Sequence, residues 1–130
     1  MLRKKNNQVS FLHVYHHVML IWAWFAVVKF NCGGDAYFGA LINSAIHVAM
    51  YGYYLMALLG WSCPWKKYLT QCQMLQFAIC LAQAVATIFV GSTPLWLTLL
   101  QVWVMVNMLV LFGNFYLKSY TKKEGAQKSE

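Results

Sequence analysis

The sequence predicts an all-α polytopic membrane protein, a transmembrane bundle of about four helices. Of its 130 residues, 61% are hydrophobic and only 10% are charged, whereas soluble domains have about 25% charged residues. Asp, Glu, Lys and Arg are absent from three long stretches, residues 6–28, 36–65 and 68–117. One membrane-spanning helix needs roughly 20 mostly apolar residues, so these stretches hold four spans. This distribution excludes a disordered chain, a disulfide scaffold and a two-domain soluble enzyme.

The individual elements follow from the apolar runs and from the Gly and Pro residues between them. The spans are expected at about residues 11–30, 37–60, 68–90 and 95–117. The segments Asn31–Asp35 and Gly91–Pro94 are expected to be turns, because Gly and Pro interrupt helices. The loop Trp61–Lys67 carries the tryptophans and lysines that suit a membrane interface. Residues 1–130 are therefore predicted to form a single membrane domain, with a polar tail at 118–130.

The basic residues are distributed unevenly over the predicted loops. With four spans, nine of the ten lie on one side: Arg3, Lys4, Lys5, Lys66, Lys67, Lys118, Lys122, Lys123 and Lys128. An excess of Lys and Arg marks the cytosolic side of a membrane protein. Both termini are therefore expected in the cytosol, with Asp35 and Ser92 in the lumen. The net charge of +7 does not indicate nucleic-acid binding, because the basic segments offer no base-reading or stacking groups.

All four histidines lie inside predicted spans, and three of them form a cluster on the first span: His13, His16 and His17. Positions i, i+3 and i+4 share one face of a helix. An ionisable side chain inside a membrane is costly, faces the bundle interior and usually marks a function. A single histidine would more often be a hydrogen-bonded core residue, but three on one face favour a chemical role.

Two further spans carry polar side chains at helical spacing. The second span has four such residues on an otherwise apolar helix: Asn43, His47, Tyr51 and Tyr54. The third span has three at intervals of three residues: Thr70, Gln73 and Gln76. For the third span, hydrogen bonding between helices is an open alternative, because membrane bundles use amides and hydroxyls in that way. Asn107 and Asn114 on the fourth span are expected to serve that purpose rather than chemistry.

Two kinds of chemistry suit a buried histidine cluster. One is a metal site in a desaturase-like membrane oxidoreductase, because imidazole is the commonest metal ligand. The spans contain no carboxylate, however, and the four cysteines have no metal-binding spacing and are expected to be packing residues. The other is acyl transfer, in which a neutral imidazole attacks a thioester and forms an acyl-imidazole. The residues favour acyl chemistry without deciding it, and a non-catalytic subunit or fragment is a third alternative.

The polar motifs together resemble a known family. His13-Val-Tyr-His16-His17, preceded by Lys4-Lys5-Asn-Asn-Gln8, resembles the HxxHH box of the ELO family of very-long-chain fatty acid elongases. Further segments resemble the later boxes of that family in the same order: Asn43–Tyr54, Trp65–Phe77, and Leu111–Tyr116 followed by Lys122 and Lys123. The resemblance covers nearly the whole chain. The context of Gln8 and Tyr15 is most similar to the polyunsaturated-acyl elongases.

The resemblance implies a 3-ketoacyl-CoA synthase, an acyltransferase of the endoplasmic reticulum membrane. Such an enzyme condenses an acyl-CoA with malonyl-CoA, releases carbon dioxide and CoA, and requires no metal or other cofactor. By its position in the box, His16 is expected to carry the acyl group, with His13 and His17 beside it. His47 is expected to assist decarboxylation or to stabilise the enolate. The implied substrate-binding residues are Asn43, Tyr51, Tyr54, Thr70, Gln73, Lys66 and Lys67.

The implied partners are the two CoA thioesters and membrane lipids. Other enzymes of the elongation cycle and a second copy of the chain are further candidates, and nucleic acid is not among them. Members of the family usually have about seven spans and an additional charged box before the histidines. The chain therefore resembles the last four spans of an elongase, and its activity in isolation is expected to be weak.

Overall fold

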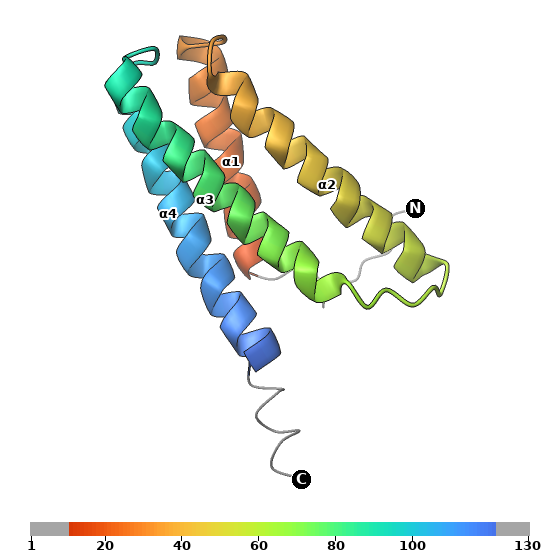
Figure 1. Ribbon diagram of the computed structural model, residues 1–130. Coiled ribbons are helices and arrows are strands. Elements are labelled where there is room, and N and C mark those ends of the chain that lie inside the picture. Colours follow the sequence, from red (N-terminus) through yellow and green to blue (C-terminus); the bar gives the residue numbers. More distant parts are fainter. Residues whose placement is uncertain (1–10, 122–130) are drawn as a thin grey trace.

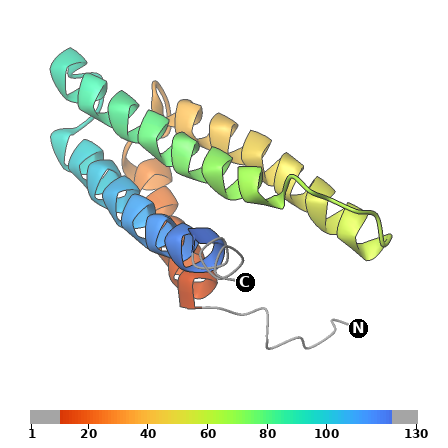
Figure 2. The same cartoon turned by 60° about the horizontal axis from the view of Figure 1, so that its bottom comes forward.

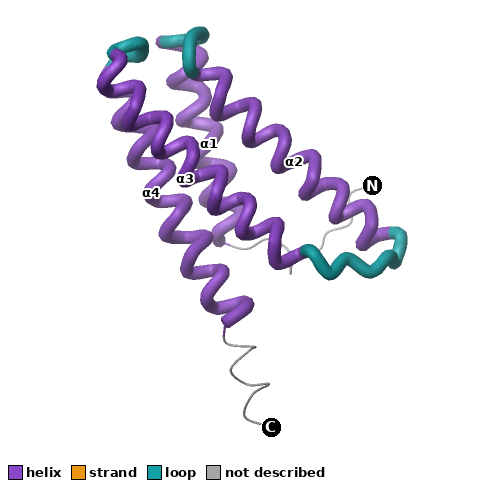
Figure 3. Tube along the Cα trace, viewed as in Figure 1, coloured by secondary structure: helices purple, strands orange, loops and turns teal. Residues whose placement is uncertain are grey.

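The computed structural model describes residues 11–121, which form four long α-helices (Figures 1 and 3). These are α1 (Phe11–Phe30), α2 (Ala36–Leu58), α3 (Lys66–Val90) and α4 (Leu95–Tyr116), followed by one wider π-helical turn, η2 (Leu117–Thr121). Within this described range there is no β-strand. All four helices are long and apolar enough to cross a membrane. The predicted all-α, four-span fold is confirmed.

The helix ends agree with the predicted ones to within two residues. Gly91 ends α3 in the left-handed conformation, with φ of 71°, and its N–H donates to the carbonyl of Thr87. Gly60, with φ of 75°, lies just after α2. The largest differences, of two residues, are at the end of α2, which is Leu58 rather than residue 60, and at the start of α3, which is Lys66 rather than residue 68. Hydropathy locates only the apolar part of the helix, whereas the backbone hydrogen bonds of α3 already begin at the polar lysines before it.

The helices alternate in direction, and their packing order differs from their order in the chain. α1 packs on α4, α4 on α3, and α3 on α2, with the most extensive packing between α3 and α4. α1 and α2 approach each other at their shared turn and diverge toward their other ends (Figures 1 and 2). The bundle is therefore an open arc with α1 and α2 at its two edges. The start of α1, the α2–α3 loop and the end of α4 lie at the same end of the molecule (Figure 1).

The buried core lies between α3, α4 and one side of α1. Its centre is formed by Phe77 of α3 with three residues of α4: Val104, Met108 and Phe112. Leu12, Tyr15 and Met19 of α1 pack against this cluster, whereas no residue of α2 is buried within the described chain. The packed centre thus consists of α3 and α4, and α2 is attached along its edge.

The cysteines correct one expectation from the sequence. All four are free, but only Cys80 is buried, while Cys32 and Cys72 are exposed. The expectation that all four are packing residues is therefore wrong for these two. Cys72 lies on a helix that is apolar on most of its surface, so the sequence does not reveal which side faces the neighbouring helices.

Side-chain hydrogen bonds connect the two turns at the opposite end of the bundle from the α2–α3 loop. Ser92 Oγ, in the α3–α4 turn, donates to Asp35 Oδ2 in the α1–α2 turn. Asn31 Nδ2 donates to Thr93 Oγ1 over 3.5 Å. The two turns therefore lie side by side at one end, as the alternating topology predicts.

Candidate active site

The three histidines of α1 lie together near the beginning of the helix. The ring centroids of His13 and His17 are 4.5 Å apart, and those of His16 and His17 are 5.3 Å apart. The i, i+3, i+4 spacing therefore gathers three imidazoles on one face, as predicted. They differ in burial, because His16 is only 8% exposed while His13 and His17 are exposed. His16 is thus the member that the rest of the bundle holds in position.

His16 contacts residues of both central helices. Its Nδ1 lies 3.0 Å from the Met108 sulfur on α4. The centroid of its ring is 5.7 Å from that of Phe112 and 6.2 Å from that of Phe77. These two aromatic rings also contact each other, with centroids 5.1 Å apart. One side of the His16 imidazole is therefore packed into the core.

A cavity of about 370 Å³ borders the histidine cluster, and all four helices contribute to its wall. Ten of the eleven predicted site residues line it: His13, His16, His17, Asn43, His47, Tyr51, Tyr54, Lys66, Thr70 and Gln73. Lys67 is the predicted residue outside the wall. The structure thus brings residues from three separate sequence motifs into one place, while their chemical roles remain predictions.

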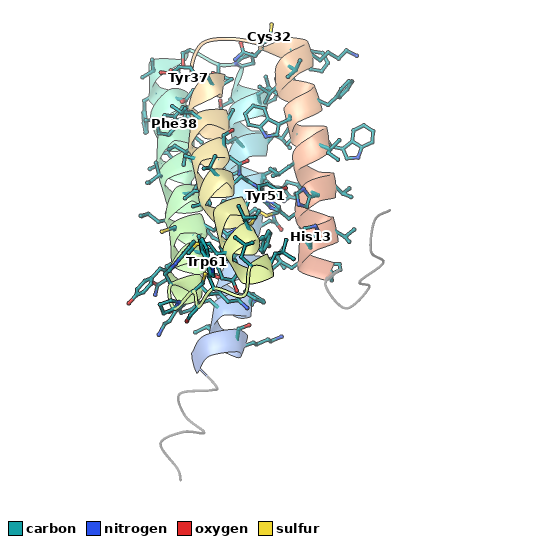
Figure 4. All side chains as sticks on the ribbon, turned by 90° about the vertical axis from the view of Figure 1, so that its right-hand side faces the viewer. His13, Cys32, Tyr37, Phe38, Tyr51 and Trp61 are labelled. Atoms are coloured by element: carbon teal, nitrogen blue, oxygen red, sulfur yellow. The ribbon has the colours of Figure 1, made fainter. Side chains whose placement is uncertain are left out.

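His47 borders this cavity from α2. The same cavity is lined by His16 and His17 of α1. The ring centroid of His47 is 6.0 Å from that of Tyr51. Figure 4 shows His13 on α1 and Tyr51 on α2, two of the four helices that contribute to the cavity wall. Imidazoles from two different spans therefore face one space, an arrangement that can hold a reacting group between them.

The polar residues of α3 do both things that the sequence left open: they line the site and they form hydrogen bonds between helices. Thr70, Gln73 and Gln76 all line the cavity. Gln73 Nε2 also donates to the Met50 sulfur of α2 over 3.7 Å, which links the two helices. Thr70 and Gln76 are themselves buried, at 7% and 5% exposure. The three polar residues therefore form one wall of the site and also contribute to helix packing.

Interhelical hydrogen bonding occurs further along α3 and α4. Gln101 Nε2 donates to Gln83 Oε1 over 2.7 Å and to the Cys80 carbonyl over 3.2 Å. Asn107 behaves differently, because its Nδ2 donates to the carbonyl of Trp103 in its own helix over 2.8 Å. The expectation that Asn107 links two helices is wrong, since a short amide side chain can reach the preceding turn of its own helix.

A second, smaller cavity of about 90 Å³ lies toward the end of the bundle with the α1–α2 and α3–α4 turns. Asn43, Gln76 and Phe77 line both this cavity and the one beside the histidines. Apolar residues such as Leu100 and Val104 line much of the smaller cavity. The two cavities are thus neighbours that share a wall, and the smaller one adds apolar space beyond the histidines.

A metal site would require several donor side chains directed at one point. Within residues 11–121, no group of three His, Cys, Asp or Glu side chains has an arrangement that could hold a metal ion. The described residues therefore supply no ligand set for the metal alternative.

Comparison with known proteins agrees with the resemblance of the motifs. The profile of the ELO family, described as the GNS1/SUR4 family, matches residues 1–128. The chain belongs to the ELO family. Very long chain fatty acid elongase 5 of Xenopus tropicalis is 41% identical over 133 residues, which cover 99% of this chain and 45% of the relative.

Two further relatives give the same picture for this ELO chain. Very long chain fatty acid elongase 5 of Mus musculus is 39% identical over 99% of the chain and 44% of the relative. Very long chain fatty acid elongase 4 of Homo sapiens is 40% identical over 98% of the chain and 43% of the relative. The ELO chain therefore spans a little less than half the length of these curated relatives.

Some residues at the site of this ELO chain were not expected from the sequence. Gln76 was expected among the polar residues of α3 but not in the site, and the apolar wall and contact residues were not singled out at all: Met50, Phe77, Met108 and Phe112. Methionine and phenylalanine are common throughout the apolar spans. Nothing in the local pattern separates those that line a cavity from those that face lipid, so their roles depend on the three-dimensional packing.

Proposed function

We propose that this ELO chain is the catalytic part of a fatty acid elongase that condenses an acyl-CoA with malonyl-CoA. The products are a 3-ketoacyl-CoA, carbon dioxide and CoA. The observation that carries this proposal is the position of His16, which is fixed by the core and lines a cavity that His47 borders from another helix. Membership of the family and the names of the relatives support the same reaction.

The first half of the reaction transfers the acyl group to the protein. A nitrogen of His16 attacks the thioester carbonyl, a C–N bond forms, the C–S bond breaks and the CoA thiolate leaves. In the second half, malonyl-CoA loses carbon dioxide and becomes an enolate. The enolate carbon attacks the acyl group, a C–C bond forms, the C–N bond breaks and His16 is regenerated.

The neighbouring residues are proposed to bind and orient the two substrates. His47 donates a hydrogen bond to the enolate oxygen as negative charge develops there. His13 and His17 stand beside the acyl carrier, and the supporting residues are Asn43, Tyr51, Tyr54, Thr70 and Gln73. All of these residues line the cavity beside His16, which supports a role in positioning the substrates.

The two ends of the cavity region suit the two ends of an acyl-CoA. Lys66 lines the histidine cavity, and Lys67 lies next to it at the start of α3. Lysine ammonium groups bind phosphates, so these two are proposed to meet the CoA phosphates. The smaller apolar cavity is proposed to take the distal part of a long, polyunsaturated acyl chain.

The protein is proposed to be a multi-pass protein of the endoplasmic reticulum membrane that uses no metal or other cofactor. The end of the bundle with Lys66 and Lys67 is proposed to face the cytosol, since cytosolic loops are enriched in basic residues. The basic residues before residue 11 and after residue 121 enter this argument by sequence only, because they lie outside the described residues. Association with other elongation enzymes or with a second copy is also a proposal.

Acylation of His16 is the decisive test. The natural full-length protein is incubated with an acyl-CoA in the absence of malonyl-CoA, digested and analysed by mass spectrometry. An acyl group should appear on the peptide that contains His16, and His16→Ala should abolish it. Asn107→Ala is the matched control, because this in-span polar side chain bonds to its own helix and lines neither cavity.

Two outcomes would overturn the proposal. One is an adduct confined to a cysteine. The other is activity that disappears with a chelator and returns with iron, which would favour the metal-dependent oxidoreductase. Feeding single fatty acids to yeast that expresses the protein, followed by gas chromatography of products two carbons longer, would define the preferred acyl chains.

A further inference from the structure

One contact of His16 connects the candidate acyl carrier to the centre of the core. Its Nδ1 lies 3.0 Å from the Met108 sulfur, a contact that joins α1 to α4. Met108 is 0% exposed and lines neither cavity. It belongs to the buried cluster with Phe77 and Phe112, the two rings that flank the imidazole. The sulfur is therefore held in place by the core and has no direct access to a bound substrate.

The chemistry of the two groups gives this contact a direction. A thioether sulfur has no hydrogen to donate and acts as a weak acceptor, whereas a neutral imidazole has one N–H and one nitrogen with a free lone pair. The Nδ1 of His16 must then be the donor, and its Nε2 carries the lone pair. In general, the hydrogen bond made by one ring nitrogen of a histidine determines which form the other nitrogen takes.

We propose that Met108 is a positioning residue for acyl transfer, because its sulfur accepts a hydrogen bond from His16 Nδ1 and thereby makes Nε2 the nitrogen that takes the acyl group. This inference rests on the proposed function, in which His16 carries the acyl chain. It adds which nitrogen reacts and which residue determines that choice. Without the sulfur, the ring could also adopt the tautomer with the proton on Nε2, which is unreactive at that nitrogen.

The contact also determines what happens to the proton during the reaction. When Nε2 attacks the thioester, the C–S bond breaks, the CoA thiolate leaves and takes a proton from water. The sulfur of Met108 is too weak a base to remove the proton from Nδ1, so the acylated ring keeps it and is a cation. When the enolate attacks the acyl carbon, the C–N bond breaks and its electron pair returns to Nε2. The neutral ring is restored with its proton still on Nδ1, and no separate base is needed.

Three variants of the natural full-length protein test this role. Met108→Leu removes the acceptor at nearly constant volume, and such swaps usually change stability little. Met108→Gln supplies a carbonyl oxygen that can accept from Nδ1 but adds an amide to the core. Met74→Leu is the matched control, because Met74 packs against the same cluster and lines neither cavity.

Two measurements are made on each variant. The first is the rate of His16 acylation by acyl-CoA without malonyl-CoA, in a single turnover. We expect this rate to fall roughly ten-fold or more in Met108→Leu with little change in the KM for acyl-CoA, and to recover in Met108→Gln to within about three-fold of the natural protein. Met74→Leu should stay within about two-fold.

The second measurement is the tautomer of His16, read from nitrogen-15 chemical shifts of labelled histidine in lipid nanodiscs. The natural protein and Met108→Gln should carry the proton on Nδ1, and Met108→Leu should show a mixture of tautomers. A packing role predicts the opposite order of activities, because leucine fills an apolar site better than glutamine. Faster acylation in Met108→Leu than in Met108→Gln would therefore overturn the inference.

The two measurements also separate this inference from the proposed function. If the natural protein is acylated on His16 but Met108→Leu keeps both its rate and its tautomer, the role of Met108 is wrong and the function stands. If His16 of the natural protein takes no acyl group, the function fails and the positioning role fails with it, whatever the tautomer.

Discussion

The packed centre of the bundle and its α2 edge contribute to the site in different ways. α3 and α4 hold most of the buried residues, including Phe77, Val104 and Met108. α2 has none within the described chain, although it carries Asn43 and His47. The centre therefore fixes the residue proposed to carry the acyl group, while the edge brings a second imidazole toward it. The geometry of the site thus depends on how α3 and α4 pack together and on how α2 is oriented beside them.

The largest expected difference between the two regions is in stability. Phe77→Ala removes a ring that is 3% exposed and should lower the free energy of unfolding by about 3–5 kcal/mol. Leu55→Ala, on the exposed face of α2, should change it by no more than about 0.5 kcal/mol. Titration of the detergent-solubilised protein with a denaturing detergent measures both. An equal loss at Leu55 would mean that α2 is as tightly packed as the centre.

The second prediction concerns whether further helices are needed to cover the exposed face of α2. Polar groups that face lipid without partners cost several kcal/mol each, and α2 leaves polar side chains such as Ser44 exposed. The chain of 130 residues is expected to elongate at no more than about a tenth of the rate reached when the N-terminal half of a relative precedes it. Elongation by yeast membranes measures the rate, with His16→Ala in the longer chain as the control. Full activity of the short chain would show that the α2 edge needs no cover.

The smallest expected effect lies within the packed centre. Gln101→Leu removes two hydrogen bonds that join α4 to α3, one to Gln83 over 2.7 Å and one to the Cys80 carbonyl over 3.2 Å. Interhelical hydrogen bonds in membranes contribute about 0.6 kcal/mol on average, so the loss of stability should be of that order. Asn107→Leu, which removes a bond within one helix, is the control and should cost less. A larger loss at Asn107 would reverse the distinction between the two amides.

The fold was largely predictable because it depends on runs of residues rather than on single contacts. The absence of charge over residues 68–117, with Gly91–Pro94 in the middle, specifies two spans and a turn. The grouping of His13, His16 and His17 follows from helical spacing alone. Their meeting with His47 on α2 could be anticipated from the family resemblance, which groups the boxes into one enzyme.

The packing order of the helices could not be predicted in the same way. Each span is apolar on most of its surface, so no single face indicates that α1 packs on α4 rather than on α2. For the same reason, Met108 does not stand out among the seven methionines of the chain. Its proximity to His16 depends on two helices that are far apart in sequence. Asn107 shows the same limit, since the sequence does not tell whether an amide bonds to a neighbouring helix or to its own.

The bonds of Ser92 to Asp35 and of Asn31 to Thr93 connect the two turns at one end of the bundle. Beyond these turns α2 packs on α3 and is linked to it through Gln73 and the Met50 sulfur, so this packing sets the tilt of α2. His47 lies about 16 Å along the helix axis from Ala36, at 1.5 Å per residue. At that distance a tilt of only about 5° displaces its imidazole by roughly 1.4 Å, and misplacements of about 1 Å can cost a hundred-fold in rate. A small change in the tilt of α2 therefore changes the distance between the imidazoles of His47 and His16 enough to affect the rate.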